Sequence, residues 1–108
     1  MKTIQKEQIM ITEIIEYKLN ESADEEKFMT EAKKFYNYFK ATFKGFIDIE
    51  FTKGEDGWIS IMHWETMEDV KACGEVLRTD PQEIADYAAL TERTSTKLTF
   101  LEQKLYLK

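Results

Sequence analysis

Three carboxylates are the side chains of this chain best suited to acid–base chemistry: Glu16, Asp48 and Glu50. Each falls in a segment where apolar and polar residues alternate, which is typical of a strand with one buried face. A carboxylate in a partly apolar cavity has its charged form disfavoured, so its pKa rises towards the range useful to a general base. The alternative is that all three are solvated or paired with lysines. The sequence leaves both interpretations open.

The other reactive side chains point to few further kinds of site. His63 is the single histidine and Cys73 the single cysteine, so neither a histidine-rich metal site nor a thiolate cluster is expected. Cys73 lies on a helical pattern, where a lone cysteine is typical of a small buried hydrophobic residue. Trp58 and Trp64 would either stack on an aromatic ligand or fill a dimer core. We therefore expect no metal site.

Length and charge narrow the class of protein. The 108 residues predict a single domain spanning 1–108. The net charge of −6 disfavours nucleic acid and anionic membrane as partners, because both require concentrated lysine and arginine. The first eight residues are polar, and no apolar run approaches the ~18 residues of a membrane span. The expected location is the cytoplasm.

A strand and a long helix are predicted in the first half of the chain. The strand covers 9–19, and Glu13 interrupts its apolar side, which would allow a bulge there. Ser22 and Glu25 have the spacing of a capping box at the start of a helix. Gly45 is predicted to end that helix in a left-handed conformation. The apolar stripe of the helix recurs at steps of three and four: Phe28, Ala32, Phe35, Phe39 and Phe43.

The stretch 46–64 predicts a hairpin with a five-residue turn over 53–57. A symmetric turn would make each residue before it share a face with one after it. One face, expected to lie under the helices, then holds the pairs Phe51/Ile59, Ile49/Ile61 and Ile47/His63. The other face holds Thr52/Trp58, Glu50/Ser60, Asp48/Met62 and Phe46/Trp64. A one-residue error in this register would move His63 to the opposite face.

The remaining elements complete a known order. Thr66 and Asp69 predict the start of a second helix, which Pro81 divides, and 94–107 predicts the last strand. The order is β-α-β-β-α-β. It predicts an α+β, ferredoxin-like fold, with a four-stranded antiparallel sheet and helices on one face.

Helices cover one side of such a sheet, which leaves the other side to be explained. Its apolar residues would form a patch on the order of several hundred Å². We expect a second copy of the chain to cover it, giving a homodimer with a small-molecule cavity between the sheets. The alternative is an open, solvated face. The expected members of the face are Met10, Ile14, Phe46, Trp58, Met62 and Trp64 with Thr12, Glu16, Asp48, Glu50 and Ser60, and the expected ligand contacts are Thr12, Ile14, Trp58, Ser60, Met62 and Trp64.

The segment from Gly57 to Asp69, GWISIMHWETMED, resembles the antibiotic biosynthesis monooxygenase-like family. The opening strand, its polar turn and the early Phe28 fit the same pattern, so the resemblance spans nearly the whole chain. It implies a dimeric α/β barrel with a ligand cavity on the uncovered sheet face of each subunit. Members include cofactor-independent oxygenases of aromatic polyketides, haem-degrading enzymes and proteins without known activity.

The resemblance also bears on cofactors. The haem-degrading branch has an asparagine on the first strand, a tryptophan on the second helix and a histidine beyond it. Ile15, Cys73 and Glu83 stand at those places here, so neither haem nor any other cofactor is expected. Trp64 matches the oxygenase branch, but this tryptophan recurs in members of differing activity.

Three functions remain open. An enzyme, a cofactor-independent monooxygenase, would act on an aromatic or quinone-like molecule with Glu16, Asp48 or Glu50 as base. A binding or sensing module would hold the same kind of molecule without turnover. A nucleic-acid binder would stack bases on Trp58 and Phe46, but the negative charge disfavours it.

Overall fold

Alternating strands and helices make up the chain, as the sequence patterns predict. The computed structural model describes residues 10–108, so Ile9, predicted to open the first strand, lies outside the described residues. Short 3-10 turns at Gln82–Ile84 and Arg93–Ser95 flank the last helix. The longer elements are β1 (Ile11–Tyr17), α1 (Glu25–Thr42), β2 (Phe46–Lys53), β3 (Trp58–Trp64), α2 (Met67–Leu77), α3 (Ala85–Ala89) and β4 (Lys97–Glu102).

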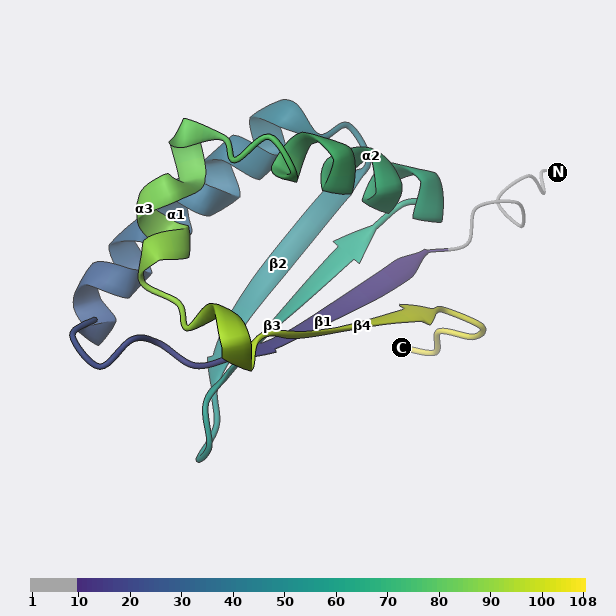
Figure 1. Ribbon diagram of the computed structural model, residues 1–108. Coiled ribbons are helices and arrows are strands. Elements are labelled where there is room, and N and C mark those ends of the chain that lie inside the picture. The colour runs from purple at the N-terminus through teal and green to yellow at the C-terminus, as the bar shows by residue number, and fades with distance from the viewer. Residues whose placement is uncertain (1–9) are drawn as a thin grey trace, which may run out of the picture.

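The strands form one antiparallel sheet in the order β2-β3-β1-β4. The three helices lie on one side of this sheet, and no helix or strand among residues 10–108 covers the other side, called here the bare face (Figure 1). The predicted α+β, ferredoxin-like fold is confirmed. β4 covers 97–102 rather than the predicted 94–107. Within residues 10–108, no helix combines the length and the apolar character needed to cross a membrane.

The predicted hairpin register is wrong by one residue. The amide of Gly54 donates to the carbonyl of Gly57 at 2.7 Å, so the turn is one residue shorter than expected. Phe51 consequently pairs with Ser60, and Ile49 pairs with Met62. Since successive side chains of a strand point to opposite faces, the shift turns all of β3 over. Its helix-facing residues are Trp58, Ser60, Met62 and Trp64, and its outward residues are Ile59, Ile61 and His63.

An irregularity in β2 restores one predicted pair. The pairing with β3 shifts between Phe46 and Asp48, as in a β-bulge, so Phe46 pairs with Trp64 as predicted. Both residues belong to the core under the helices, however, and not to the bare face. The bulge expected near Glu13 is not found, because β1 pairs with both neighbours without a break.

α1 begins and ends at residues other than those predicted. Asp24 is its N-cap and accepts a hydrogen bond from the Lys27 amide at 2.7 Å, in place of the predicted Ser22. The helix ends at Thr42, and Gly45 does not adopt a positive φ. A side chain at position 45 would instead collide with the carboxyl of Asp69, so close approach explains this glycine.

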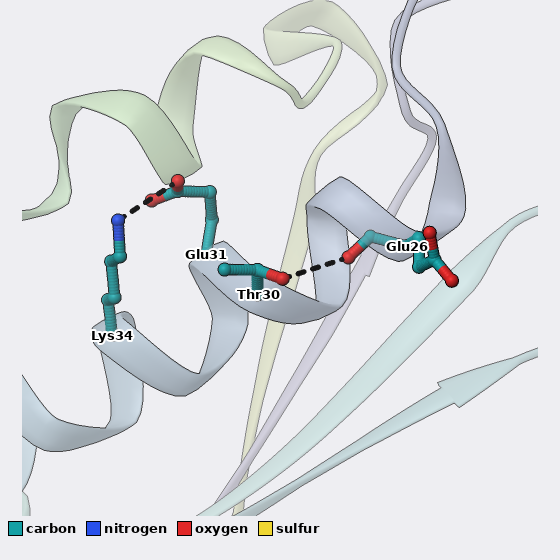
Figure 2. Close-up of polar contacts among 4 residues, drawn as sticks. All are labelled: Glu26, Thr30, Glu31 and Lys34. Carbon is teal, nitrogen blue, oxygen red and sulfur yellow. Dashed lines mark hydrogen bonds and ion pairs between the residues drawn. The ribbon is translucent and has the colours of Figure 1, made fainter.

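The side of α1 away from the sheet carries local polar contacts (Figure 2). The Thr30 hydroxyl donates to the carbonyl of Glu26 at 3.2 Å. Lys34 lies 3.4 Å from the carboxylate of Glu31, which is buried although charged. These contacts leave the apolar stripe free to pack on the sheet. All five predicted members are buried, Phe28, Ala32, Phe35 and Phe39 within the helix and Phe43 at its C-cap.

α2 begins as predicted. The Thr66 hydroxyl accepts from the Asp69 amide at 3.1 Å and donates to the Asp69 carboxylate at 2.8 Å. The helix ends at Leu77, and Pro81 precedes the next helical turn. The second helical region is therefore divided at Pro81, as predicted.

Candidate functional site

A cavity of about 230 Å³ lies between the sheet and the helices. Its walls come from β1, β3 and β4 below and from all three helices above. Most of the lining is apolar, with a few polar side chains among it. The lining residues are Glu13, Ile15, Tyr17, Phe35, Phe39, Met62, Cys73, Leu77, Ile84, Tyr87, Ala88, Thr91, Thr96 and Leu98.

Strand parity explains the polar residues on the floor of the cavity. Glu13, Ile15 and Tyr17 have the same parity on β1, so all three point towards the helices. Glu13 stands opposite Met62, and Tyr17 stands opposite Trp58. Glu13 therefore occupies a helix-facing position of β1, where the alternation of the strand predicts an apolar residue.

Glu13 and Trp64 form the charged end of the cavity. The indole Nε1–H of Trp64 donates to Glu13 Oε1 at 2.9 Å, and Trp64 is itself fully buried. Burial raises the pKa of Glu13 above its ordinary value, and the hydrogen bond from Trp64 opposes that rise. A fixed carboxylate whose pKa is raised towards neutrality has the properties of a general base.

Tyr17, Ser60 and Tyr87 form a group of hydroxyl side chains, called here the hydroxyl cluster, of which Tyr17 and Tyr87 line the cavity. The Tyr17 hydroxyl lies 2.7 Å from Ser60 Oγ, and Tyr87 lines the same cavity as Tyr17. Burial raises the pKa of Tyr17 and, more strongly, that of Tyr87. Both phenols therefore stay protonated, and the cluster offers uncharged donors and acceptors.

Cys73 forms part of the wall beside Glu13. Burial, and to a smaller extent the neighbouring Glu13 carboxylate, raises the pKa of its thiol to about 12. Since the thiolate is the nucleophilic form, Cys73 acts as an apolar wall residue near neutral pH. This agrees with its interpretation as a small buried hydrophobic residue.

The residues predicted to form one site are divided between the two faces of the sheet. Trp58, Ser60, Met62 and Trp64 lie under the helices, whereas Thr12 and Ile14 lie on the bare face as predicted. This cavity lies on the helix side of the sheet. The cavity that the resemblance implied, on the uncovered face between two subunits, stays a prediction. The single-residue shift in the hairpin explains why the β3 residues Trp58, Ser60, Met62 and Trp64 lie under the helices.

The three predicted bases do not line this cavity. Glu16 has the outward parity on β1, opposite Ile59. Asp48 and Glu50 are exposed on β2, and the Asp48 carboxylate lies 2.7 Å from His63 Nδ1. His63, predicted to point towards the helices, therefore belongs to the bare face.

Sequence reasoning missed Glu13, Tyr17 and Tyr87 as site residues. The signal for Glu13 was present, since it breaks the apolar side of an otherwise regular strand. Tyr17 and Tyr87 gave no such signal, because aromatic residues at core positions are ordinary. Only the packing of α3 over β1 brings their hydroxyls together.

Sequence comparison gives no relative for this chain: no protein-family model and no curated protein matches it. Comparison of structures finds proteins of similar fold. SnoaB, a cofactor-independent oxygenase from Streptomyces nogalater, is similar with a TM-score of 0.66 at 12% identity, over 92% of this chain and 97% of that one. A Caulobacter crescentus protein provisionally classed as an antibiotic biosynthesis monooxygenase gives 0.67 at 16% identity, over 91% and 92%.

A third similar structure is that of a dimeric protein. It is a dimeric protein of unknown function with a ferredoxin-like fold from Bacteroides fragilis, with a TM-score of 0.54 and 16% identity over 87% of this chain and 96% of that one. Nearly the full length of each chain is matched, although few residues are shared. The chain therefore shares the ferredoxin-like fold of these proteins.

Proposed function

We propose that this chain is a cofactor-independent monooxygenase that takes a small phenolic or quinone-like ring compound into the cavity under the helices, with Glu13 as general base. The observation that carries the proposal is the Glu13 carboxylate on the wall of a mainly apolar cavity, held there by the Trp64 indole at 2.9 Å. The similarity to SnoaB in fold supports the same class of reaction.

The chemistry requires only a base, dioxygen and an acidic substrate. Glu13 would remove a proton from a hydroxyl or an activated CH₂ group, leaving an electron-rich anion. That anion would transfer one electron to dioxygen, and the two radicals would combine to form a C–O bond. Protonation by Glu13 gives a hydroperoxide, which loses water to leave a carbonyl. One oxygen atom enters the product and the other leaves as water.

The environment of Glu13 supports this role. A base works best when its pKa lies near the working pH, and burial moves the pKa of Glu13 in that direction. Trp64 supports the base by fixing one carboxylate oxygen, which leaves the other free to meet the substrate. The packed rings of Phe35 and Phe39, with centroids 4.2 Å apart, form part of the apolar wall of the same cavity.

Oxygen uptake tests the proposal. Purified protein would be incubated with a panel of hydroquinones and anthrones in an oxygen-electrode cell, with product identified by mass spectrometry. We expect Glu13→Gln to lower kcat by about 10²-fold or more, the usual contribution of a general base. Glu65→Gln, a change at an exposed carboxylate, is the matched control and should keep wild-type activity.

The same assay separates the competing bases. Glu16, Asp48 and Glu50 remain predicted bases for a cavity on the bare face, which would need a second subunit to close it. Loss of activity in Glu16→Gln, Asp48→Asn or Glu50→Gln, with Glu13→Gln fully active, would reject Glu13. Saturable binding of a ring compound with no oxygen uptake by the wild type would instead identify a non-catalytic binding module.

We further propose that the chain forms a homodimer through the bare face of the sheet. Ile14 and Ile61 pair directly on that face, and Ile59 and Leu101 extend the apolar surface. A second copy laid against it would bury these side chains. The dimeric Bacteroides fragilis protein of the same fold supports a dimeric state.

A further inference from the structure

The cavity under the helices reaches the surface of the molecule beside the first residues of β4. Most of its lining residues are buried or half-buried, but Thr96 and Leu98 are exposed. Leu98 pairs with Ile15 of β1, so both side chains lie on the helix side of the sheet. Leu98 is nevertheless 51% exposed. A side chain that lines a cavity and is also half exposed stands at the opening of that cavity.

The edge position of β4 explains why the cavity opens there. β4 is an outer strand of the sheet, and Phe100, on the same face as Leu98, is also exposed. On the neighbouring strand β1, the helix-facing residues Ile11 and Tyr17 are buried. The helices therefore cover β1 and leave the helix side of β4 open to solvent.

Hydrogen bonds fix the backbone around this opening. On the helix side, the amide group of the Asn20 side chain donates to the carbonyl of Ala89 at 2.6 Å. The hydroxyl of Thr91, a lining residue, donates to the carbonyl of Ala88 at 2.9 Å. On the sheet side, β4 is paired with β1. Because both backbones are held, the width of the opening depends on its side chains, and Leu98 is the larger of the two exposed ones.

A second route into the cavity would pass through a wall that the cavity shares with an outer groove. This groove has a volume of about 420 Å³, and Leu77, Ile84 and Ala88 line both the groove and the cavity. All three residues are half-buried and stand between the two spaces. Entry from the groove would require them to move, whereas the opening beside Leu98 already reaches solvent.

We propose that the substrate enters the cavity past Leu98, and that Leu98 determines specificity by limiting the width of the molecule that the cavity admits. This inference deepens the proposed function and rests on it for the cavity being the substrate site. Leu98 acts at the entrance and takes no part in the proton transfer assigned to Glu13.

Labelling of Cys73 tests the entrance without turnover. Cys73 is the single cysteine of the chain and lines the cavity, so its modification reports which molecules enter. Methyl and benzyl methanethiosulfonate would be compared at pH 8, with intact-protein mass spectrometry to follow the reaction. In both reagents the Cys73 thiolate attacks the sulfenyl sulfur, forms a mixed disulfide and releases methanesulfinate. The ratio of the benzyl rate to the methyl rate therefore reports the width of the entrance.

Opposite changes at Leu98 should move this ratio in opposite directions. We expect Leu98→Ala to raise it about fivefold or more and Leu98→Trp to lower it about fivefold or more, because one widens and the other narrows the opening. Leu101 lies on the same strand at a similar exposure of 47%, but on the opposite face. Leu101→Ala and Leu101→Trp are therefore the matched controls and should keep the wild-type ratio.

The outcomes distinguish the entrance from a loosened fold and from the oxygenase. A wild-type ratio in both Leu98 variants would overturn the inference, as would a ratio raised by Ile84→Ala alone, which would move the entrance to the outer groove. A loosened fold would raise the ratio in both Leu98 variants, so the decrease expected for Leu98→Trp identifies a narrowed opening. Opposite shifts at Leu98, together with no oxygen uptake from any hydroquinone, would keep the entrance and reject the oxygenase.

Discussion

Burial of Glu13 suits its proposed role as a base but lowers the stability of the folded chain. Its pKa is raised in the folded chain above the value of an unfolded chain, chiefly by burial. The folded state therefore binds its proton more tightly than the unfolded state does. Stability must fall as the pH rises from the unfolded pKa of Glu13 through the raised folded one, and the cost is complete above both.

Removing the charge should therefore stabilise the fold. The side chain of Glu13→Gln can still accept from the Trp64 indole, but it has no charge to desolvate. We expect its Tm to exceed that of the wild type at pH 8, with the difference shrinking towards pH 4. Thermal unfolding across this range measures it, with Glu65→Gln as the exposed control. A difference that is constant with pH would contradict the assigned pKa direction.

The reactivity of the Cys73 thiol gives a second test at a single residue. With its pKa raised to about 12, the thiol of the folded chain carries very little thiolate at pH 8. We expect a disulfide reagent such as DTNB to react with native protein at least about a hundredfold more slowly than with protein in urea, where the thiol is exposed and its pKa ordinary. Equally rapid labelling of the native protein would show that the wall of the cavity opens readily.

Among the elements, the β2–β3 hairpin decides which side chains enter the cavity. Gly57 has a φ of 156°, and a Cβ there would meet the Tyr17 carbonyl oxygen at 2.9 Å. Gly57→Ala should therefore lower the free energy of unfolding by ~1–3 kcal/mol through strain. At Gly54 the nearest atom would be 3.6 Å away, so Gly54→Ala is the matched control and should cost clearly less. Urea titration of both variants checks this, and equal losses would reject the role of close approach.

The elements also show what the sequence could and could not predict. The order of strands and helices followed from periodicity, because the stripe of α1 and the alternation of β1 are regular over many residues. The register of β3 did not, because the two glycines of the turn fit either a four-residue or a five-residue loop. One residue of error then moved Trp58, Ser60, Met62 and Trp64 to the wrong face. The outward parity of Thr12, Ile14 and Glu16 was correct because β1 needed no turn to set it.

The one-residue error in the register of β3 changed the predicted site more than it changed the predicted fold. The predicted bases were chosen because they would lie in a partly apolar cavity. Glu16, Asp48 and Glu50 do share the bare face, but Trp58 and Trp64 lie on the opposite one. Glu13 was recognised only as an interruption of the strand, since a buried carboxylate can be inferred only once its neighbours are known. Tyr87 reaches Tyr17 across a sequence separation that no local pattern reports.

At the scale of the whole molecule, the bare sheet face remains to be explained. Helices protect one side of the sheet (Figure 1). The lining residues place the cavity on that side. The other side presents isoleucines to solvent beside exposed carboxylates such as Asp48 and Glu50. A second copy would cover the apolar centre of this face and leave the carboxylates nearer its rim, which is the usual composition of a dimer interface.

Sedimentation tests the dimer directly. We expect the wild type to sediment at about twice the 12.8 kDa mass of one chain at micromolar concentration. Ile61→Glu would place a charge at the centre of the face, opposite Ile14. The free energy needed to bury that unpaired charge between two copies would exceed the free energy gained from the contact. The variant should therefore sediment as a monomer while its circular dichroism stays that of the wild type. Met29→Glu makes the same change at an exposed position of α1 on the helix side and should remain a dimer. A monomeric wild type at micromolar concentration would reject the dimer, and with it any site between two sheets, but it would leave the cavity under the helices intact.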